Sequence, residues 1–336
     1  MTAHGAIDCH AHYVPPSVID RLAGAGADLG IRLFEETPGC TCLHFDYGLK
    51  VRPFFETLLD TGKRRAAMDT QGVGIQILSL WADIFGYGMP KDAGARWHRL
   101  MNECLARAAD AEPERYRILV SPPLQDAAAA ARELEHGMKT FGAVGAIVAD
   151  SVEGVNLGEA PLDEFWAAAE ALKAPVFIHP IDPMPSPRVK KFALAQVAAY
   201  TMNTTLAVGS LISGGVMDRF PNLQILLSHA GGGVPYLIGR FDCMHHRADR
   251  KVSGNVAQDK PSAYLRRFHY DTIAHAAAPL RYLAGLVGTD RVMLGTDYPF
   301  PPRDDDPVAT IRSAGIEGAD FDKVLRGNAA ALFGLK

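Results

Sequence analysis

The chain has 336 residues, of which 48% are hydrophobic and 21% are charged, and its formal net charge is −4. This composition is typical of a soluble globular protein, and no apolar run reaches the roughly 18–20 residues that a membrane span requires. Acidic and basic residues are interleaved along the chain, which argues against the basic surface typical of nucleic-acid binding. We therefore expect neither nucleic acid nor a membrane among the partners of this protein.

The N-terminal residues and the cysteines indicate a cellular compartment. Residues 1–8 show neither the basic start nor the apolar stretch of a signal peptide, which favours a cytoplasmic location. The five cysteines form no complete zinc motif, because Cys40 and Cys42 have no second pair, and reduced thiols are the simplest interpretation. Whether Cys40 and Cys42 have a further role stays open.

Short apolar runs alternate with longer stretches of helical spacing along the whole chain. Strand–helix alternation is typical of parallel strands joined by helical crossovers, and eight such units fit a closed (β/α)₈ TIM barrel better than an open sheet. We expect one domain over residues 1–336. The eight runs are Ala6–Cys9, Gly74–Leu80, Arg117–Ser121, Val144–Ala149, Pro175–His179, Gln224–Ser228, Phe268–Asp271 and Arg291–Leu294.

One segment interrupts the alternation after the first run. Residues 24–53 contain the turn-forming pair Pro38-Gly39 and a β-like stretch, Cys42–Tyr47. We interpret the segment as a small β-hairpin insertion after strand 1, packed over the barrel mouth.

The first run ends in the motif Ile7-Asp8-Cys9-His10-Ala11-His12. In a strand, residues i and i+2 point to the same face, so the side chains of His10 and His12 project together. Two imidazoles at a strand end are able to bind one divalent metal ion. The pair alone is weak support for a metal site, because two of twelve histidines falling this close is unremarkable.

Three further strands end in a residue of the same chemistry. The fifth run ends at His179, the sixth at His229, and the eighth is followed by Asp297. Because barrel active sites lie at the carboxyl ends of the strands, these side chains and the first-strand histidines should converge on one mouth. Unrelated capping histidines and a helix-capping Asp297 are the alternative, which four separate strand ends disfavour.

This ordered set of motifs resembles the amidohydrolase superfamily, whose pattern is His-x-His on strand 1, His on strands 5 and 6, and Asp on strand 8. Within it, the chain looks most like the aminocarboxymuconate semialdehyde decarboxylase group. The matching stretches are Ile7–His12, His179-Pro180, Gly214–Val216, Phe220-Pro221, Ser228–Gly233 and Gly295–Phe300.

The resemblance implies a metal centre with one ion. Two-metal members of the superfamily usually bridge their ions with a carboxylated lysine at the end of strand 4, whereas this chain has no lysine in Ile147–Ser151. The expected ligands are His10, His12, His179 and Asp297, with an open position for water or substrate. Zn²⁺ suits this mixture of imidazole and carboxylate, and Mn²⁺ or Fe²⁺ are the alternatives.

His229 then becomes the expected acid–base residue, since the pKa of imidazole lies near neutrality. The alternative is that His229 only orients a metal-bound water. Asp297 is expected to combine metal ligation with proton transfer.

Arg52 and Arg240 match, by position, arginines that hold the substrate carboxylate in the resembled group. A guanidinium offers two parallel hydrogen bonds to a carboxylate. In that group the second arginine enters the site of the neighbouring subunit, so the resemblance implies a homodimer. Surface arginines in helix-end ion pairs are the alternative. The chain departs from the group at Ile181 and Ala193, where large aromatic residues are expected, so the resemblance does not by itself identify the substrate.

The function expected from these residues is metal-dependent, non-oxidative decarboxylation of a carboxylated aromatic or muconate semialdehyde-type substrate. The same site could instead hydrolyse a lactone, amide or ester with a metal-activated water. The paired arginines and the family match favour decarboxylation. A barrel that has lost its activity is disfavoured, because all five site positions are occupied by competent residues.

Overall fold

A computed structural model describes residues 5–35, 37, 41–181, 187–247 and 249–335. Its central strands overlap each of the eight predicted runs. They are β1 (Ala6–His12), β5 (Val73–Ser79), β6 (Tyr116–Ile118), β7 (Ala146–Ala149), β10 (Val176–His179), β11 (Ile225–Leu227), β12 (Phe268–Asp271) and β13 (Val292–Met293).

The eight strands close into a ring of parallel neighbours. Hydrogen-bonded ladders give the orders β1-β5-β6 and β13-β12-β11-β10-β7. Two parallel bridges join these groups, Val120 with Ala146 on one side and Ala11 with Tyr298 on the other. The predicted (β/α)₈ barrel is therefore confirmed.

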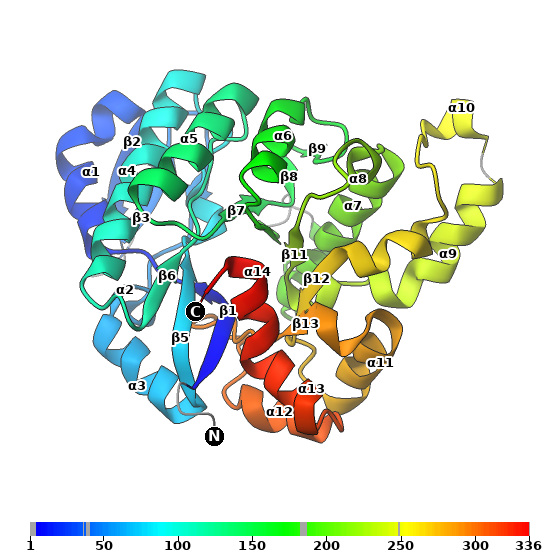
Figure 1. Cartoon of the computed structure of the whole chain (residues 1–336). Helices are drawn as coiled ribbons and strands as arrows, with labels where there is room; N and C mark the ends of the chain where they lie inside the picture. Colours follow the sequence, from blue (N-terminus) through cyan, green and yellow to red (C-terminus); the bar gives the residue numbers. More distant parts are fainter. Residues whose placement is uncertain (1–4, 36, 38–40, 182–186, 248, 336) are drawn as a thin grey trace.

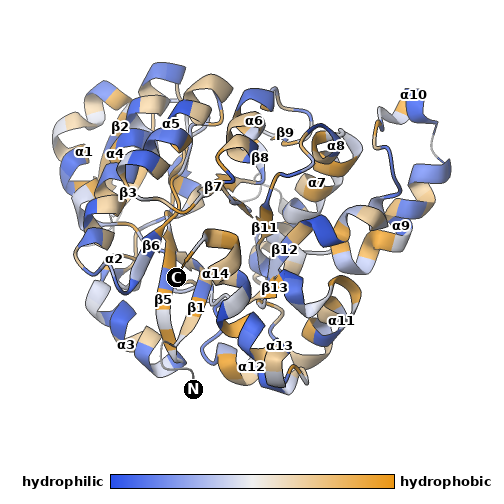
Figure 2. Cartoon of the chain, viewed as in Figure 1, coloured by the Kyte–Doolittle hydropathy of each residue, from blue (hydrophilic) through white to orange (hydrophobic). Residues whose placement is uncertain are grey.

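The strands are buried on both faces, as expected for a sheet covered by helices. Every residue of β7, β10, β11 and β12 is buried, and Figure 2 shows apolar residues along the strands while the outer helices carry both polar and apolar faces. The helices lie around the ring in Figure 1. They are α3 (Thr61–Gln71), α4 (Lys91–Asp110), α5 (Ala127–Thr140), α6 (Asp163–Ala171), α7 (Tyr200–Ser213), α8 (Val216–Arg219), α9 (Val234–Arg247), α10 (Arg250–Ser253), α11 (Ala277–Val287), α12 (Pro307–Ser313), α13 (Gly318–Asp322) and α14 (Asn328–Phe333).

The segment predicted as an insertion holds the end of one helix and a small antiparallel sheet. Helix α1 (Pro16–Leu29) precedes β2 (Ile31–Glu35), β3 (Thr41–Phe45) and β4 (Lys50–Val51), which pair in the order β2-β3-β4, and α2 (Glu56–Leu59) follows. Cys42 is buried on β3, and Cys40 lies outside the described residues. The boundaries of the insertion and the single-domain assignment stay predictions.

Short elements at the strand ends shape the mouth of the barrel. They are η1 (Ala82–Ile84), the hairpin of β8 (Ser151–Val152) and β9 (Val155–Asn156), η3 (Ala195–Ala199) and η4 (His229–Gly231). The remaining turns are η2 (Pro187–Val189), η5 (Pro261–Arg267), η6 (Thr289–Arg291) and η7 (Lys323–Gly327). Within the described residues, the structure has no helix with the length and apolar character needed to cross a membrane.

Candidate active site

The carboxyl ends of four strands bring all five predicted side chains together. His10 and His12 extend from β1, His179 ends β10, His229 follows β11, and Asp297 follows β13. The Nε2 atoms of His10 and His12 are 3.0 Å apart, and they lie 3.3 and 3.5 Å from Asp297 Oδ1. His229 Nε2 is 3.5 Å from Asp297 Oδ2, and the rings of His12 and His179 are 4.4 Å apart.

These separations fit a shared divalent ion. Nitrogen ligands about 2.0–2.1 Å from one metal ion in tetrahedral geometry lie roughly 3.3 Å from each other. Both ring nitrogens of His179 are buried without a hydrogen-bond partner in the described part of the chain, which would be costly unless something else bound them. Burial holds the pKa of His179 well below its usual value and lowers the pKa of His12 to about 4, so both imidazoles are neutral, as metal ligation requires.

The hydrogen bonds of the first-strand histidines leave their Nε2 atoms available for a metal. His12 Nδ1 lies 3.3 Å from the carbonyl oxygen of Leu80, and His10 Nδ1 lies 2.7 Å from Asp271 Oδ2. A ligating histidine commonly donates its other N–H in this way, which fixes the tautomer. Burial lowers the pKa of His10, but the carboxylates of Asp297 and Asp271 outweigh burial and raise it to about 10. The carboxylates of Asp271 and Asp297 therefore favour a positive charge next to His10.

Two sets of four ligands are compatible with the geometry. The ligand atoms of His10, His179, His229 and Asp297 all lie within 4.8 Å of one another. His12 Nε2 and His229 Nε2 each lie 3.5 Å from an oxygen of Asp297, so these distances do not separate the two sets, and His12 belongs to the predicted one. The choice between His12 and His229 as fourth ligand is a prediction that metal content can test.

The sequence analysis missed Asp271, the last residue of β12. Its side chain accepts hydrogen bonds from His10 Nδ1 and from the backbone N–H groups of His229 and Ala230, at 2.9 and 2.7 Å. Burial raises the pKa of Asp271, but the hydrogen bond and charge of His10, the charge of His229 and the hydrogen bond from the Ala230 N–H together outweigh burial, so the pKa lies below its usual value. The signal was present, because the predicted strand Phe268–Asp271 ends in a carboxylate at the same edge as the other site residues.

The same contacts explain an unusual backbone at His229. His229 and Ala230 have φ values of 53° and 56°, in the left-handed region that residues other than glycine rarely adopt. Such conformations persist where the surroundings over-determine them. Asp271 supplies that restraint, since its two oxygens hold the two successive N–H groups and aim the His229 ring at Asp297.

A second buried carboxylate, Asp8, fixes the other side of the centre. It accepts hydrogen bonds from His10 N, Thr296 Oγ1 and Gln76 Nε2, at 3.0, 2.6 and 2.8 Å. Gln76 Oε1 in turn accepts from the guanidinium of Arg64 at 2.7 Å. Asp8 therefore connects β1, β5 and the loop after β13, from which three predicted site residues extend.

The charged sequence Lys63-Arg64-Arg65 predicts a solvated helix face, and this prediction is wrong at Arg64, which is fully buried on α3. Its guanidinium donates to the carbonyl oxygen of His12 and lies 5.0 and 4.8 Å from the rings of Tyr13 and Tyr298. Burial lowers the pKa of Arg64 to about 10. The side chain stays charged at neutral pH and anchors the backbone next to both His12 and Asp297.

A cavity of about 690 Å³ opens over the His/Asp centre. His179, His229 and Asp297 form its base. Its walls are mainly apolar and aromatic, and include Phe55, Trp81, Tyr200, Ile273, Phe300 and Pro301. Trp81 follows directly on the second predicted strand, so the strand-end rule that located the histidines could have found it. The cavity is suited to a flat, mostly apolar ligand held over the metal centre.

The two predicted arginines, Arg52 and Arg240, lie in different places. Arg52 lines the cavity, where its guanidinium lies 5.1 Å from the ring of Trp81 and 3.2 Å from Asp83 Oδ2. Arg240 lies on the exposed side of α9 and is not among the residues that line the cavity. One chain therefore supplies one of the two arginines to its own site.

A buried His/Asp centre at the mouth of a (β/α)₈ barrel defines a class of metal-dependent enzymes. The chain belongs to the amidohydrolase family, whose model matches residues 7–335.

The similar proteins narrow the class to decarboxylases. The chain is 30% identical to 2-amino-3-carboxymuconate-6-semialdehyde decarboxylase from Dictyostelium discoideum, over 98% of this chain and 91% of that protein. It is 31% identical to γ-resorcylate decarboxylase from a Polaromonas species, over 83% and 89% of the two chains. These matches confirm the predicted resemblance and the expectation of a carboxy-lyase.

Solved structures give the same result. The 5-carboxyvanillate decarboxylase from Sphingomonas paucimobilis superposes with a TM-score of 0.82, at 27% identity, covering 99% of this chain and all of that one. A dihydroxybenzoic acid decarboxylase from a Polaromonas species has a TM-score of 0.77, at 26% identity, covering 99% and 97% of the two chains. That structure contains manganese and the inhibitor 2-nitroresorcinol. The manganese in that similar structure supports a divalent metal ion as the ligand of the His/Asp centre described here.

Proposed function

We propose that this protein is a metal-dependent, non-oxidative decarboxylase acting on a carboxylated aromatic or muconate semialdehyde-type acid. One observation carries the proposal. The His229 ring lies at the base of an apolar, aromatic-walled cavity, next to the buried side chains of His10, His179 and Asp297. The arrangement supports a proton-transfer role for His229 beside a metal-binding centre, with space above it for a flat conjugated acid.

His10, His12, His179 and Asp297 would hold the metal ion. When bound, the ion supplies positive charge that attracts and orients an anionic substrate. We propose Zn²⁺ as the native ion, from the mixed imidazole and carboxylate donors. Mn²⁺ is the first alternative to test, because a similar decarboxylase structure contains manganese.

His229 would deliver the proton that the reaction requires. Breaking the bond between carbon and carboxylate leaves an electron pair on carbon, which is unfavourable. If protonated His229 first transfers its proton to that carbon, the electrons of the breaking bond return to the conjugated system as CO₂ leaves. The substrate anion and one proton thereby become the decarboxylated product and CO₂, and His229 is reprotonated from solvent.

Arg52 and the aromatic walls would orient the substrate. The Arg52 guanidinium lies over the rings of Trp81 and Phe300, at 5.1 and 5.9 Å, and it also faces Asp83. A substrate carboxylate has to compete with Asp83 for this guanidinium. The walls would hold the flat part of the substrate by offset or edge contacts.

A homodimer would bring Arg240 to the site of the neighbouring subunit. Tyr236, Arg240 and Met244 follow each other at intervals of four residues on α9, so they share one face. Tyr236 is 84% exposed, and Met202 and Leu206 on the neighbouring α7 are also exposed apolar residues. An apolar surface around an arginine suits a second copy of this chain better than water. The cytoplasmic location stays a prediction.

The proposed activity is tested by CO₂ release from hydroxybenzoates and muconate semialdehyde-type acids, using protein loaded with Zn²⁺ or Mn²⁺. We expect release that disappears after chelation and falls strongly in His229→Ala. A panel of lactones, amides and esters is measured alongside. Turnover of that panel without any CO₂ release would contradict the proposal and identify a hydrolase.

A further inference from the structure

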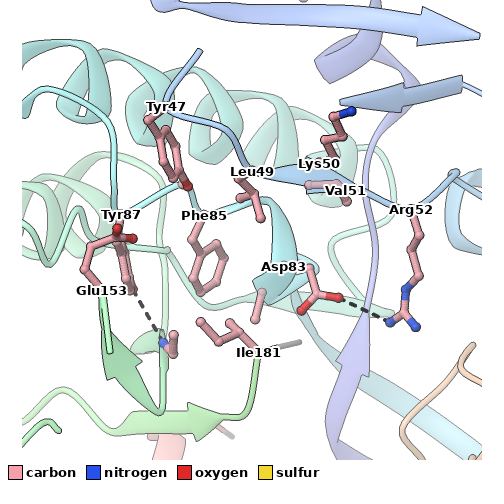
Figure 3. A pocket seen from close by; sticks show the side chains of 13 residues that line it. Tyr47, Leu49, Lys50, Val51, Arg52, Asp83, Phe85, Tyr87, Glu153 and Ile181 are labelled. Atoms are coloured by element: carbon pink, nitrogen blue, oxygen red, sulfur yellow. Dashed lines mark hydrogen bonds and ion pairs between the residues drawn. The ribbon is translucent and has the colours of Figure 1, made fainter. Parts of the chain in front are cut away.

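Figure 3 shows the residues that line a second cavity, which we call the side cavity. It shares Arg52 and Asp83 with the main cavity. Its volume is about 140 Å³. Strand β4 and the turn before it supply Leu49 and Val51, the residues that follow η1 supply Phe85 and Tyr87, and Ile181 lies opposite them. Val51, Phe85 and Tyr87 are buried, so the floor of the side cavity is fixed by the core.

The Arg52–Asp83 ion pair separates the two cavities. Both residues line both cavities, and their charged groups are 3.2 Å apart. The Asp83 side chain is only 9% exposed, whereas that of Arg52 is 44% exposed. Within the described part of the chain, a ligand bound over the metal centre would pass the more exposed Arg52 to enter the side cavity.

The size and lining of the side cavity fit one ring. A protein cavity of about 150 Å³ lined by leucine, isoleucine and phenylalanine binds a single benzene molecule. The side cavity has nearly the same volume and presents Leu49, Phe85 and Ile181. It is far larger than the roughly 10–15 Å³ that one water molecule requires.

The rim is formed by polar side chains in close contact. A Cβ atom at Gly88 would lie 2.4 Å from Tyr47 Cε2 and 2.8 Å from Glu153 Oε2, so the absence of a side chain there lets Tyr47 and Glu153 approach. No hydrogen bond or ion pair engages the Glu153 carboxylate within the described part of the chain. A carboxylate at the rim is able to accept a hydrogen bond from a hydroxyl group on the edge of a bound ring.

We propose that the side cavity is a subsite for a second ring of the substrate, so that the enzyme acts on two-ring aryl carboxylates. The ring that bears the carboxylate lies over the metal centre, and a phenyl or hydroxyphenyl substituent passes Arg52 and packs on Leu49, Phe85 and Ile181. This inference rests on the proposed decarboxylase function and names its substrate class.

Binding of unreactive analogues tests the subsite without turnover. Calorimetry on manganese-loaded protein compares 2-nitrophenol with its positional phenyl derivatives. We expect one phenyl derivative to bind at least 10-fold more tightly than 2-nitrophenol. Leu49→Trp fills the side cavity and should remove this preference, while binding of 2-nitrophenol changes less than 2-fold. Phe34→Trp, on the same small sheet but exposed, is the matched control and should change neither.

Two outcomes would overturn the subsite: no phenyl derivative binds more tightly than 2-nitrophenol, or Leu49→Trp weakens both ligands equally. A CO₂ assay on the same proteins separates this failure from failure of the proposed function. Release from a one-ring acid, together with either of these outcomes, refutes the side-cavity proposal alone. Absence of release from every one-ring and two-ring acid refutes the decarboxylase function itself.

Discussion

The metal-binding end of the barrel and the wall of the cavity above it are held in different ways. At the metal-binding end, directional hydrogen bonds between buried groups fix each side chain, such as those from His10 to Asp271 and from Arg64 to the His12 carbonyl oxygen. The wall consists mainly of aromatic contacts, such as Trp81 with Phe300 at 5.9 Å between ring centroids. Hydrogen bonds weaken steeply when their geometry changes, whereas apolar contacts are non-directional.

This difference separates the reaction from the choice of substrate. A change at the metal-binding end should disturb ligand geometry and therefore catalysis. A change in the wall should alter which acids bind in the cavity, while the rate of the chemical step stays nearly the same. Four experiments, taken from the largest expected effect to the smallest, test this division.

Removing a metal ligand should have the largest effect. His179→Ala deletes an imidazole that has no other partner, so we expect loss of bound metal and of CO₂ release. Metal analysis by mass spectrometry after dialysis measures this, with His136→Ala on the outer helix α5 as control. Full metal content in His179→Ala would show that the centre is not a metal site. Comparing His12→Ala with His229→Ala then identifies the fourth ligand: we expect only His12→Ala to lose metal, while His229→Ala keeps metal and loses about 10²–10⁴-fold in rate.

Asp150, directly after β7, shows what burial does to a carboxylate that lacks a histidine partner, and the effect can be measured as a pH dependence of stability. It is buried like Asp271 but has no histidine beside it, and burial raises its pKa to about 6. Ionisation of Asp150 therefore lowers the free energy of unfolding as the pH rises from about 4 to 6. Above pH 6 the free energy of unfolding stays at this lower level. Asp150→Asn should be more stable than wild type at pH 8 by up to about 3 kcal/mol, with little difference at pH 4. Urea unfolding at both pH values measures this, and equal stability at pH 8 would show that Asp150 is not desolvated.

The carboxylate behind His10 should matter less than a ligand. Asp271→Asn keeps the shape but weakens the hydrogen bond to His10 Nδ1, so metal affinity should fall by about 10–100-fold. Competition with a metal-binding dye gives the affinity, and Asp290→Asn on the surface is the matched control. The rate of metal-saturated Asp271→Asn should also fall, because Asp271 holds the His229 backbone. An unchanged affinity would mean that Asp271 only supports the fold.

A change in the wall should have the smallest effect. Phe300→Leu removes one aromatic face but keeps the wall apolar, so we expect KM to rise by roughly 3–10-fold, the range of about 1 kcal/mol of aromatic contact, with kcat nearly unchanged. Steady-state kinetics on the best substrate separates the two constants. A large drop in kcat would mean that the wall also positions the reacting carbon, and the division drawn above would fail.

The sequence by itself determined the barrel and the members of its centre. Strand and helix periodicities gave eight strands that all overlap the observed ones, because burial on both faces of a parallel sheet leaves a strong apolar pattern. Strand ends then located His10, His12, His179, His229 and Asp297, since all parallel strands of a barrel end at the same mouth. The native metal, the dimer and the role of each residue remain predictions.

Only the tertiary structure decided what surrounds that centre. His10 and Asp271 are 261 residues apart, and Asp8 and Thr296 are 288 apart, so no local pattern connects them. Arg64 lies in a helix whose charged sequence predicts an exposed face, yet packing between Tyr13 and Tyr298 buries it. The side cavity depends on the spacing between the small sheet, the η1 segment and Ile181. Such distances follow from the packing of whole elements, which the spacing of residues along one chain does not encode.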